Sequence, residues 1–514
     1  MDNTSKKKAV QGVAWASASS WGGQLLSFAI YAGLARLLNP DTFGVVAIAG
    51  VYIAFIQLLV AQGFGMAIVQ RLEVEEQHLN SAFWIAIATA GVLCLFSHLC
   101  ENQIARFFGE PRVAPVIGWL SYCLFFHAMS SVQTAILTRD LHFRALAIRY
   151  LLATAISGAI GLTMAFKGWG VWSLVGQQMA NAVLSSVFMW WSVSWRPSFQ
   201  ISLRHLNDLY HFSIKIAGND LLWFFAQKSD QTMVGYGFGP LGLGPYSLAS
   251  RLPTLLYDGI IGPLGSVAFP AFSKLQSDRE KFENALYKFC EISYFVSFPI
   301  FTGLAAIAPS LVPVLFGAKW MAAIPLLQVL AIYGAARCAL GFMHPLMLAR
   351  GEAGLYLILN ILLAAMTFLG CLATARLSPL AIAISVVVSM VLFGAIFLEV
   401  AKQKLRLVVG PILKSLLFPA ASSSLMLVLV VLERNYLSRS FSRVLTLAVC
   451  IATGAVIYVA TAFLVNPELI KLVWRLISDH VFSSDSGASE QVAMATPGYV
   501  AESAGSFVET SQDR

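Results

Sequence analysis

Charged side chains stand inside stretches of this chain that are otherwise almost wholly apolar and long enough to be membrane helices. If they faced lipid, each would cost on the order of 2.5–3.5 kcal/mol at mid-membrane, or on the order of 20 kcal/mol together. We therefore expect most of them to face the protein interior or a wet cavity, with Lys215 near enough to a helix end to reach the headgroups. The charges are Lys215, Asp220, Lys228, Asp230, Arg251, Asp258 and Arg337.

The polar residues and the tryptophan between positions 219 and 230 follow the period of an α-helix. Asn219, Trp223, Gln227 and Asp230 recur every three to four residues. In a helix this spacing places them on one face as a polar stripe. We expect the stripe to line a cavity.

Two interpretations of the neighbouring charges stay open. Arg251 and Asp258 are seven residues apart and share a helix face, and Lys228 and Asp230 are expected at a similar depth. In the first, these charges and Arg337 take part in binding a substrate. Alternatively, Lys228 or Arg251 pairs with Asp230 or Asp258 and locks two helices together.

No motif of catalysis, nucleotide binding or metal binding accompanies these charges. The sequence has no GxxxxGK[ST] loop, and its GxGxxG match at Gly237–Gly242 lies in a short turn between two apolar stretches, with no strand before it. The eight histidines show no ligand spacing, and the seven cysteines are scattered singly. We therefore expect no cofactor, no metal site and no enzymatic activity.

The elements that must position the charges are transmembrane helices. Hydrophobic residues make up 58% of the chain and charged residues 12%, whereas a soluble domain carries about a quarter charged residues. Apolar runs of about 20 residues span a bilayer as helices, and barrel strands are about half as long. The sequence predicts an all-α membrane protein with about fourteen transmembrane helices, at 14–35, 43–66, 82–100, 114–137, 147–166, 170–192, 212–236, 243–270, 287–308, 325–348, 355–375, 380–400, 410–432 and 444–465.

Lysine and arginine are distributed unevenly over the predicted loops. With the N-terminus in the cytoplasm, the cytoplasmic segments include Lys6–Lys8 and Lys402–Arg406, and the opposite loops carry far fewer cations. This is the positive-inside bias, so the net charge of +8 reports membrane topology and not nucleic-acid binding. We expect an inner-membrane protein with both termini in the cytoplasm and no cleaved signal peptide.

The chain contains an internal repeat. Segment 38–49 aligns with segment 238–249, and two further anchors follow at offsets of 208 and 211 residues. The identities in the first anchor are Pro40 with Pro240, Gly44 with Gly244 and Ala49 with Ala249. Two six-helix copies that begin on the same side of the membrane are parallel repeats. The predicted parts are a six-helix lobe at 1–192, a cytoplasmic linker at 193–211, a second six-helix lobe at 212–400, two additional helices with a cytoplasmic amphipathic end at 401–482 and a disordered tail at 483–514.

Several segments resemble a known family of transporters. Residues Ala35–Gly44, Gly65–Arg71, Ala82–Trp84, Ile104–Pro111 and Thr138–Arg144 are similar to the polysaccharide-transporter branch of the multidrug/oligosaccharidyl-lipid/polysaccharide exporter superfamily. The colanic acid exporter-like members are the most similar, over roughly the whole membrane part of the chain.

This resemblance implies two six-helix lobes around a V-shaped cavity that opens alternately to each side. It implies as cargo a polyprenyl-pyrophosphate-linked oligosaccharide used in exopolysaccharide or lipopolysaccharide assembly, with membrane lipids and the assembly machinery as further partners. No residue roles transfer, because these families have no invariant catalytic motif. For such a cargo, Lys228, Arg251 and Arg337 could offset the charge of the pyrophosphate, because arginine makes forked contacts with phosphate. Trp223 and Tyr246 could stack on sugar rings, although both residue types are more often packing or interface residues.

Two other functions compete with the flippase hypothesis. A cation-coupled exporter of drugs or metabolites on the same fold would need a carboxylate switch, for which Asp220, Asp230 or Asp258 could serve. A membrane glycosyltransferase or polymerase would need catalytic carboxylates on a large loop. The longest predicted loop runs only from Val193 to His211, which disfavours the enzyme.

Overall fold

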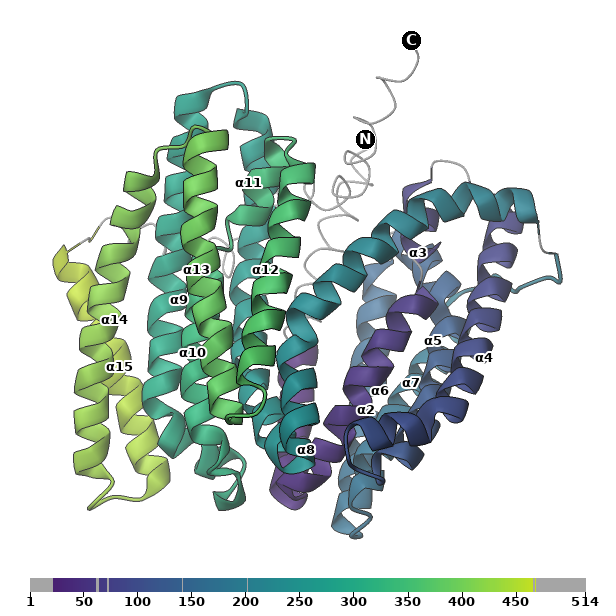
Figure 1. Ribbon diagram of the computed structural model, residues 1–514, viewed down its shortest axis with the longest axis horizontal. Helices are drawn as coiled ribbons and strands as arrows, with labels where there is room; N and C mark the ends of the chain where they lie inside the picture. The colour runs from purple at the N-terminus through teal and green to yellow at the C-terminus, as the bar shows by residue number, and fades with distance from the viewer. Residues whose placement is uncertain are drawn as a thin grey trace. The chain divides into compact units, whose positions relative to one another are not determined.

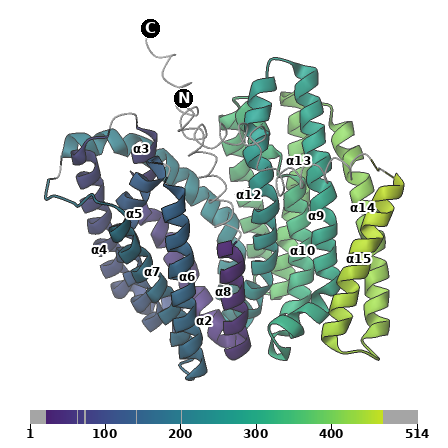
Figure 2. The same ribbon diagram turned by 180° about the vertical axis from the view of Figure 1, so that it is seen from behind.

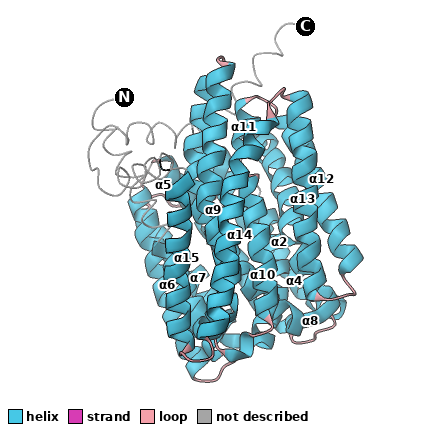
Figure 3. Ribbon diagram, turned by 90° about the vertical axis from the view of Figure 1, so that its left-hand side faces the viewer, coloured by secondary structure: helices cyan, strands magenta, loops and turns pink. Residues whose placement is uncertain are grey.

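The computed structural model describes residues 22–61, 64–71, 74–140, 142–200, 202–465 and 467, and within these ranges every regular element is a helix (Figure 3). Residues 22–37 are helical. The elements that follow are α2 (Pro40–Ala61), α3 (Phe64–Gln70), α4 (Glu76–Phe107), α5 (Val113–Arg139), α6 (Phe143–Phe166), α7 (Val171–Ser192), α8 (Leu203–Leu275), α9 (Arg279–Leu315), the 3-10 helix η1 (Ala318–Trp320), α10 (Ala323–Ala339), α11 (Met343–Ala349), α12 (Ala353–Thr374), α13 (Pro379–Lys404), α14 (Val409–Leu437) and α15 (Arg443–Val465).

The predicted all-α membrane class is confirmed. Helix lies at every predicted span, although the first span is described only from residue 22. In the described part of the chain, ten helical segments are long and apolar enough to cross a membrane. The count of fourteen stays a prediction, because α7 and α8 carry more polar residues and are not among the ten. The predicted tail at 483–514 lies outside the described residues.

The chain divides into two compact units that share α8. The first contains the described residues up to Lys228 together with Gly239–Gly244, and the second contains Ser229–Phe238 and the described residues from Pro245 onward. In the first unit α4 packs along α5, and α6 packs along α7 (Figure 1). In the second unit α9 packs against α10, and the two additional C-terminal helices, α14 and α15, both pack against α9 (Figure 2). The lobe boundaries expected from the sequence stay predictions.

Helix α8 is two helices joined at a sharp turn. Gly239 has φ 58° and ψ −159°, a backbone conformation that is accessible essentially to glycine alone. Pro240 follows and begins the second helix, where its missing N–H removes no intrahelical hydrogen bond. The two parts, 203–238 and 240–275, contain the separate spans predicted at 212–236 and 243–270.

The repeated proline and glycine residues pack against one another reciprocally. A Cβ atom added to Gly44 would collide with the backbone of Pro240, and one added to Gly244 would collide with the backbone of Pro40. All four residues belong to the first compact unit. The glycine of each repeat thus contacts the proline of the other repeat. Such a reciprocal contact is what a two-fold interface between two copies produces. We call this contact the proline–glycine seam.

An arginine on the loop between α4 and α5 fastens that loop to the start of α2, next to Pro40. Arg112 donates to Asp41 Oδ2 at 2.6 Å and Oδ1 at 3.0 Å, and its Nε donates to Glu110 Oε1 at 2.7 Å. Such forked charge-assisted hydrogen bonds are geometrically specific. The Arg112 guanidinium holds the pKa of the Glu110 carboxyl below its usual range.

The non-helical stretch between α7 and α8 docks on the start of α4. Asn80 exchanges two hydrogen bonds with Ser198, through its Nδ2 to the hydroxyl at 2.7 Å and through its Oδ1 from the main-chain N–H at 3.0 Å. The Trp84 indole donates to the Ser198 carbonyl at 2.9 Å, and its ring stacks on Phe199 with centroids 4.4 Å apart. The Ser202 N–H donates to Ser81 Oγ at 3.0 Å. We call residues 193–200 together with Ser202 the docked connector.

Candidate functional site

Three of the predicted site residues come together in the second compact unit. Arg251 and Asp258 are both exposed on the second part of α8, as their seven-residue spacing predicts, and Arg337 is half-buried in the last turn of α10. Asp258 lies within electrostatic reach of both arginines. We call Arg251, Asp258 and Arg337 the arginine–aspartate group, and its formal charge is one positive unit.

Arg337 is held by an aromatic ring that the sequence analysis did not single out. Its guanidinium carbon lies 3.7 Å from the centroid of the Tyr257 ring, a close cation–π contact. The contact fixes the position of the guanidinium beside the ring. Tyr257 precedes Asp258 in the chain, so one turn of α8 supplies both a carboxylate and an aromatic ring to Arg337.

The position of Arg337 depends on a break in the helix that the sequence predicted as one span at 325–348. The structure ends α10 at Ala339 and begins α11 at Met343, with a turn between them. A Cβ atom at Gly341 would lie 2.8 Å from Ile261 Cδ1, so glycine allows this turn to approach α8 closely. Pro345 falls in the first turn of α11, where a helix tolerates proline.

Asp230 has a structural partner in the same unit. The Tyr246 hydroxyl donates to Asp230 Oδ2 at 2.8 Å, and the Gln231 main-chain N–H donates to Oδ1 at 2.7 Å. The tyrosine hydrogen bond joins the two parts of α8 across the Gly239 turn. Tyr246 has no exposed surface, so here it is a packing residue, the more common of the two roles considered from the sequence, and no sugar reaches its ring.

The remaining predicted residues lie on the first part of α8. Gln227 and Lys228 are half-buried and belong to the first compact unit. Asn219 and Trp223 fall within helix α8, but their side chains lie outside the described part of the structure. The cavity-lining role of this stripe therefore stays a prediction.

One further aromatic residue connects the two described clusters of the second unit. Tyr333 lies within electrostatic reach of both Arg337 and Asp230. It is four residues before Arg337, so the two side chains lie on one face of α10. This helical spacing is the signal by which the sequence could have revealed Tyr333.

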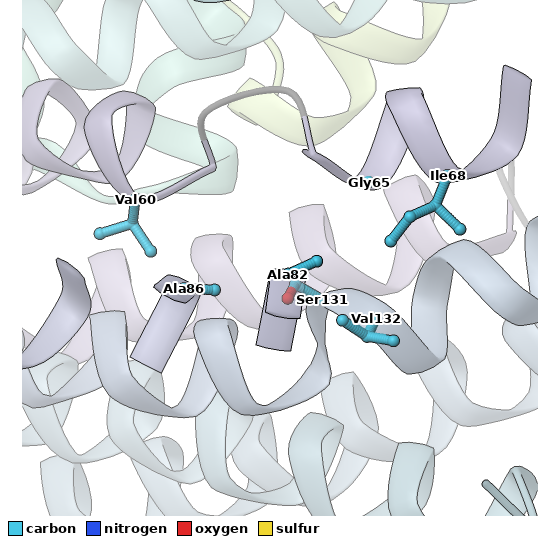
Figure 4. A pocket seen from close by; sticks show the side chains of 7 residues that line it. All are labelled: Val60, Gly65, Ile68, Ala82, Ala86, Ser131 and Val132. Atoms are coloured by element: carbon cyan, nitrogen blue, oxygen red, sulfur yellow. The ribbon is translucent and has the colours of Figure 1, made fainter. Parts of the chain in front are cut away.

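A small cavity in the first unit is not a substrate site. It measures about 20 Å³, and Figure 4 shows side chains of mainly apolar character around it. A space of this size holds about one water molecule, so it is a packing gap between α2, α3, α4 and α5. Its lining residues are Val60, Gly65, Ile68, Ala82, Ala86, Ser131 and Val132.

Comparison with known proteins places the chain in a family. Residues 33–325, more than half of the chain, match the family described as polysaccharide biosynthesis protein. The chain belongs to this family. The resemblance seen in the sequence is thereby confirmed, and the assignment agrees with the prediction that this polysaccharide biosynthesis protein is not an enzyme.

Relatives of this polysaccharide biosynthesis protein include two curated proteins. The succinoglycan biosynthesis transport protein ExoT of Rhizobium meliloti (strain 1021) is 27% identical over 326 residues, which cover 63% of this chain and 66% of ExoT. The teichuronic acid biosynthesis protein TuaB of Bacillus subtilis (strain 168) is 24% identical over 461 residues, which cover 88% of this chain and 94% of TuaB.

A solved structure shares the fold. The lipid II flippase MurJ, in an inward closed conformation, superposes with a TM-score of 0.71 at 14% sequence identity and covers 88% of this chain and 99% of MurJ. At this identity the likeness concerns the fold alone. Because it covers 88% of this chain, the shared fold reaches beyond residue 325, where the family match ends.

Proposed function

We propose that this polysaccharide biosynthesis protein is an inner-membrane flippase for polyprenyl-pyrophosphate-linked oligosaccharide repeat units in exopolysaccharide or lipopolysaccharide synthesis. Transport proceeds by alternating access, with both termini in the cytoplasm. Three lines of support are the family, the transport function in the name of ExoT and the lipid II flippase fold of MurJ. The observation that carries the proposal is the arginine–aspartate group.

The arginine–aspartate group suits a pyrophosphate. A lipid-linked sugar pyrophosphate is too polar to cross hydrocarbon unaided and needs a polar path. Arg251 is exposed, and the guanidinium of Arg337 is held beside the Tyr257 ring. Planar guanidinium groups make paired hydrogen bonds to phosphate oxygens. The Asp258 carboxylate attracts both arginines electrostatically and would repel a bound anion, which favours its release.

The membrane potential favours outward movement of such a cargo. An inside-negative potential contributes about 2.3 kcal/mol per charge per 100 mV. An uncompensated pyrophosphate dianion therefore gains several kcal/mol on moving from the cytoplasmic to the outer leaflet.

The test is a lipid extract from a source strain that lacks the gene, analysed by mass spectrometry. We expect polyprenyl pyrophosphate carrying a complete repeat unit to accumulate while surface polysaccharide is lost. Wild-type protein should clear the intermediate, whereas Arg251→Ala should reach the membrane without clearing it. Arg439→Ala, which removes an exposed arginine between α14 and α15, is the matched control and should behave as wild type.

Two results would overturn the proposal. Unchanged lipid intermediates in the deletion strain, with altered sensitivity to cationic compounds, would favour the cation-coupled exporter. Normal clearance by Arg251→Ala would remove the arginine–aspartate group from substrate binding.

A further inference from the structure

Two histidines and a glutamate meet in the first compact unit, away from the arginine–aspartate group. One ligand atom from each of Glu75, His78 and His205 lies within 4.8 Å of the other two. Glu75 and His78 belong to the start of α4, and His205 belongs to the first turn of α8. Two imidazoles and a carboxylate are a common ligand set for zinc and related divalent transition metals.

The geometry directs the three side chains toward one point. His205 Nε2 lies 3.4 Å from Glu75 Oε2. The rings of His78 and His205 stand at 89° with centroids 4.4 Å apart. His78 is 2% exposed, whereas the Glu75 side chain is 68% exposed. The cluster therefore has a buried nitrogen side and an open carboxylate side, through which an ion and a water molecule can enter.

His205 is already oriented as a metal ligand would be. Its Nδ1 lies 2.7 Å from Ser202 Oγ, which leaves Nε2 facing Glu75. Histidines that bind metals are usually fixed by a hydrogen bond at the other ring nitrogen. Ser202 is itself held, because its main-chain N–H donates to Ser81 Oγ at 3.0 Å.

Metal binding would require small changes of His78 and Glu75. The Glu75 main-chain N–H donates to His78 Nδ1 at 3.2 Å. This long hydrogen bond is lost whichever ring nitrogen binds the ion, because Nδ1 then holds either the metal or the proton. Ligand atoms bound to one zinc ion lie roughly 3.3 Å apart, given bonds of about 2.0–2.2 Å. The three ligand atoms, which lie within 4.8 Å of one another, must therefore approach by no more than about 1.5 Å for the site to close.

We infer that Glu75, His78 and His205 bind one divalent transition-metal ion, and that zinc fits best. Three protein ligands leave a fourth position open to water. The ion would join the first turn of α8 to the first turn of α4, at the end of the docked connector. The spacing of histidines along the chain predicted no metal site, because His78 and His205 are 127 residues apart and only the fold brings them together.

The test measures metal binding directly and does not depend on transport. Full-length protein is purified in detergent with a tag that contains no histidine, stripped with a chelator and titrated with zinc against a chromophoric competitor. We expect one ion per chain with micromolar affinity, and bound cobalt should give the visible absorption of a low-symmetry site. His205→Gln and Glu75→Gln should each weaken binding by at least about tenfold.

A matched histidine variant and a stability measurement keep the result interpretable. His142→Gln changes an exposed histidine outside the cluster and should bind zinc as wild type does. Zinc should raise the unfolding temperature of wild type and His142→Gln but not of His205→Gln. If wild type binds no zinc at millimolar concentration, or if both cluster variants bind as tightly as wild type, the site does not exist.

Discussion

The proline–glycine seam predicts a destabilisation large enough to measure. Gly44→Ala places a methyl group against the backbone of Pro240, and Gly244→Ala places one against the backbone of Pro40. Alanine in a helix gains about 0.5–1 kcal/mol over glycine. Overpacking costs about 1–3 kcal/mol when side chains can adjust, and a backbone cannot rotate away. We expect each variant to lose at least about 1 kcal/mol of stability.

Two glycines on the same two helices, α2 and α8, serve as matched controls. A Cβ atom at Gly50 in α2 or at Gly262 in the second part of α8 has no neighbouring heavy atom within 4 Å. Gly50→Ala and Gly262→Ala should therefore be neutral or slightly stabilising, because they gain helix propensity without a collision. The comparison separates the seam from the general effect of a methyl group in these helices.

Thermal unfolding in detergent with a thiol-reactive dye is a suitable assay, because five of the seven cysteines are buried. Combining Gly44→Ala with Gly244→Ala should cost less than the sum of the single changes. Once one methyl group has opened the seam, the second finds room, and residues in contact are expected to be non-additive. Unfolding of both single variants at the wild-type temperature would refute the reciprocal packing, and strict additivity would refute a shared seam.

Three further predictions concern single contacts. Arg337→Lys should clear lipid intermediates better than Arg337→Ala but less well than wild type. The reason is that lysine keeps the positive charge but lacks the planar guanidinium. Equal clearance by all three proteins would exclude a role for Arg337. Tyr246→Phe should lower the unfolding free energy by about 1–3 kcal/mol, because it removes the hydrogen bond that the buried Tyr246 hydroxyl donates to Asp230 Oδ2. An unchanged unfolding temperature would contradict this. Arg112→Ala should lower the unfolding temperature at neutral pH. This difference in unfolding temperature from wild type should shrink as the pH falls below about 4.5, because a carboxyl with a depressed pKa, here that of Glu110, stabilises the fold only while it is ionised. A difference that persists in acid would contradict this.

The helices could be predicted from sequence because their cause is local. A run of about 20 apolar residues must be helical in lipid wherever it lies in the chain. The shared face of Arg251 and Asp258 follows from the helical period in the same way. The match of Pro40 with Pro240 in the internal repeat already identified residues of the proline–glycine seam.

Other features depend on contacts between distant segments, which the sequence does not record. Tyrosine is a residue type that can stack on sugars, so the sequence alone allowed this role for Tyr246. The turn at Gly239 brings Tyr246 against Asp230, where its side chain is buried. The break between α10 and α11 was missed because the residues around Gly341 are as apolar as the helices beside them. Arg337 was named as a site residue, but its contact with Tyr257 required the packing of α10 against α8.

The docked connector has a consequence for synthesis on the ribosome. Its partners Asn80, Ser81 and Trp84 are all translated more than a hundred residues before Ser198. The connector can therefore dock as soon as it emerges, since domains form in order from the N-terminus during synthesis. Docking would fasten the chain that precedes α8 while the second unit is still being made. The nascent protein would thus have its first unit fastened before the second unit is complete. Four hydrogen bonds and one pair of stacked rings would hold this contact.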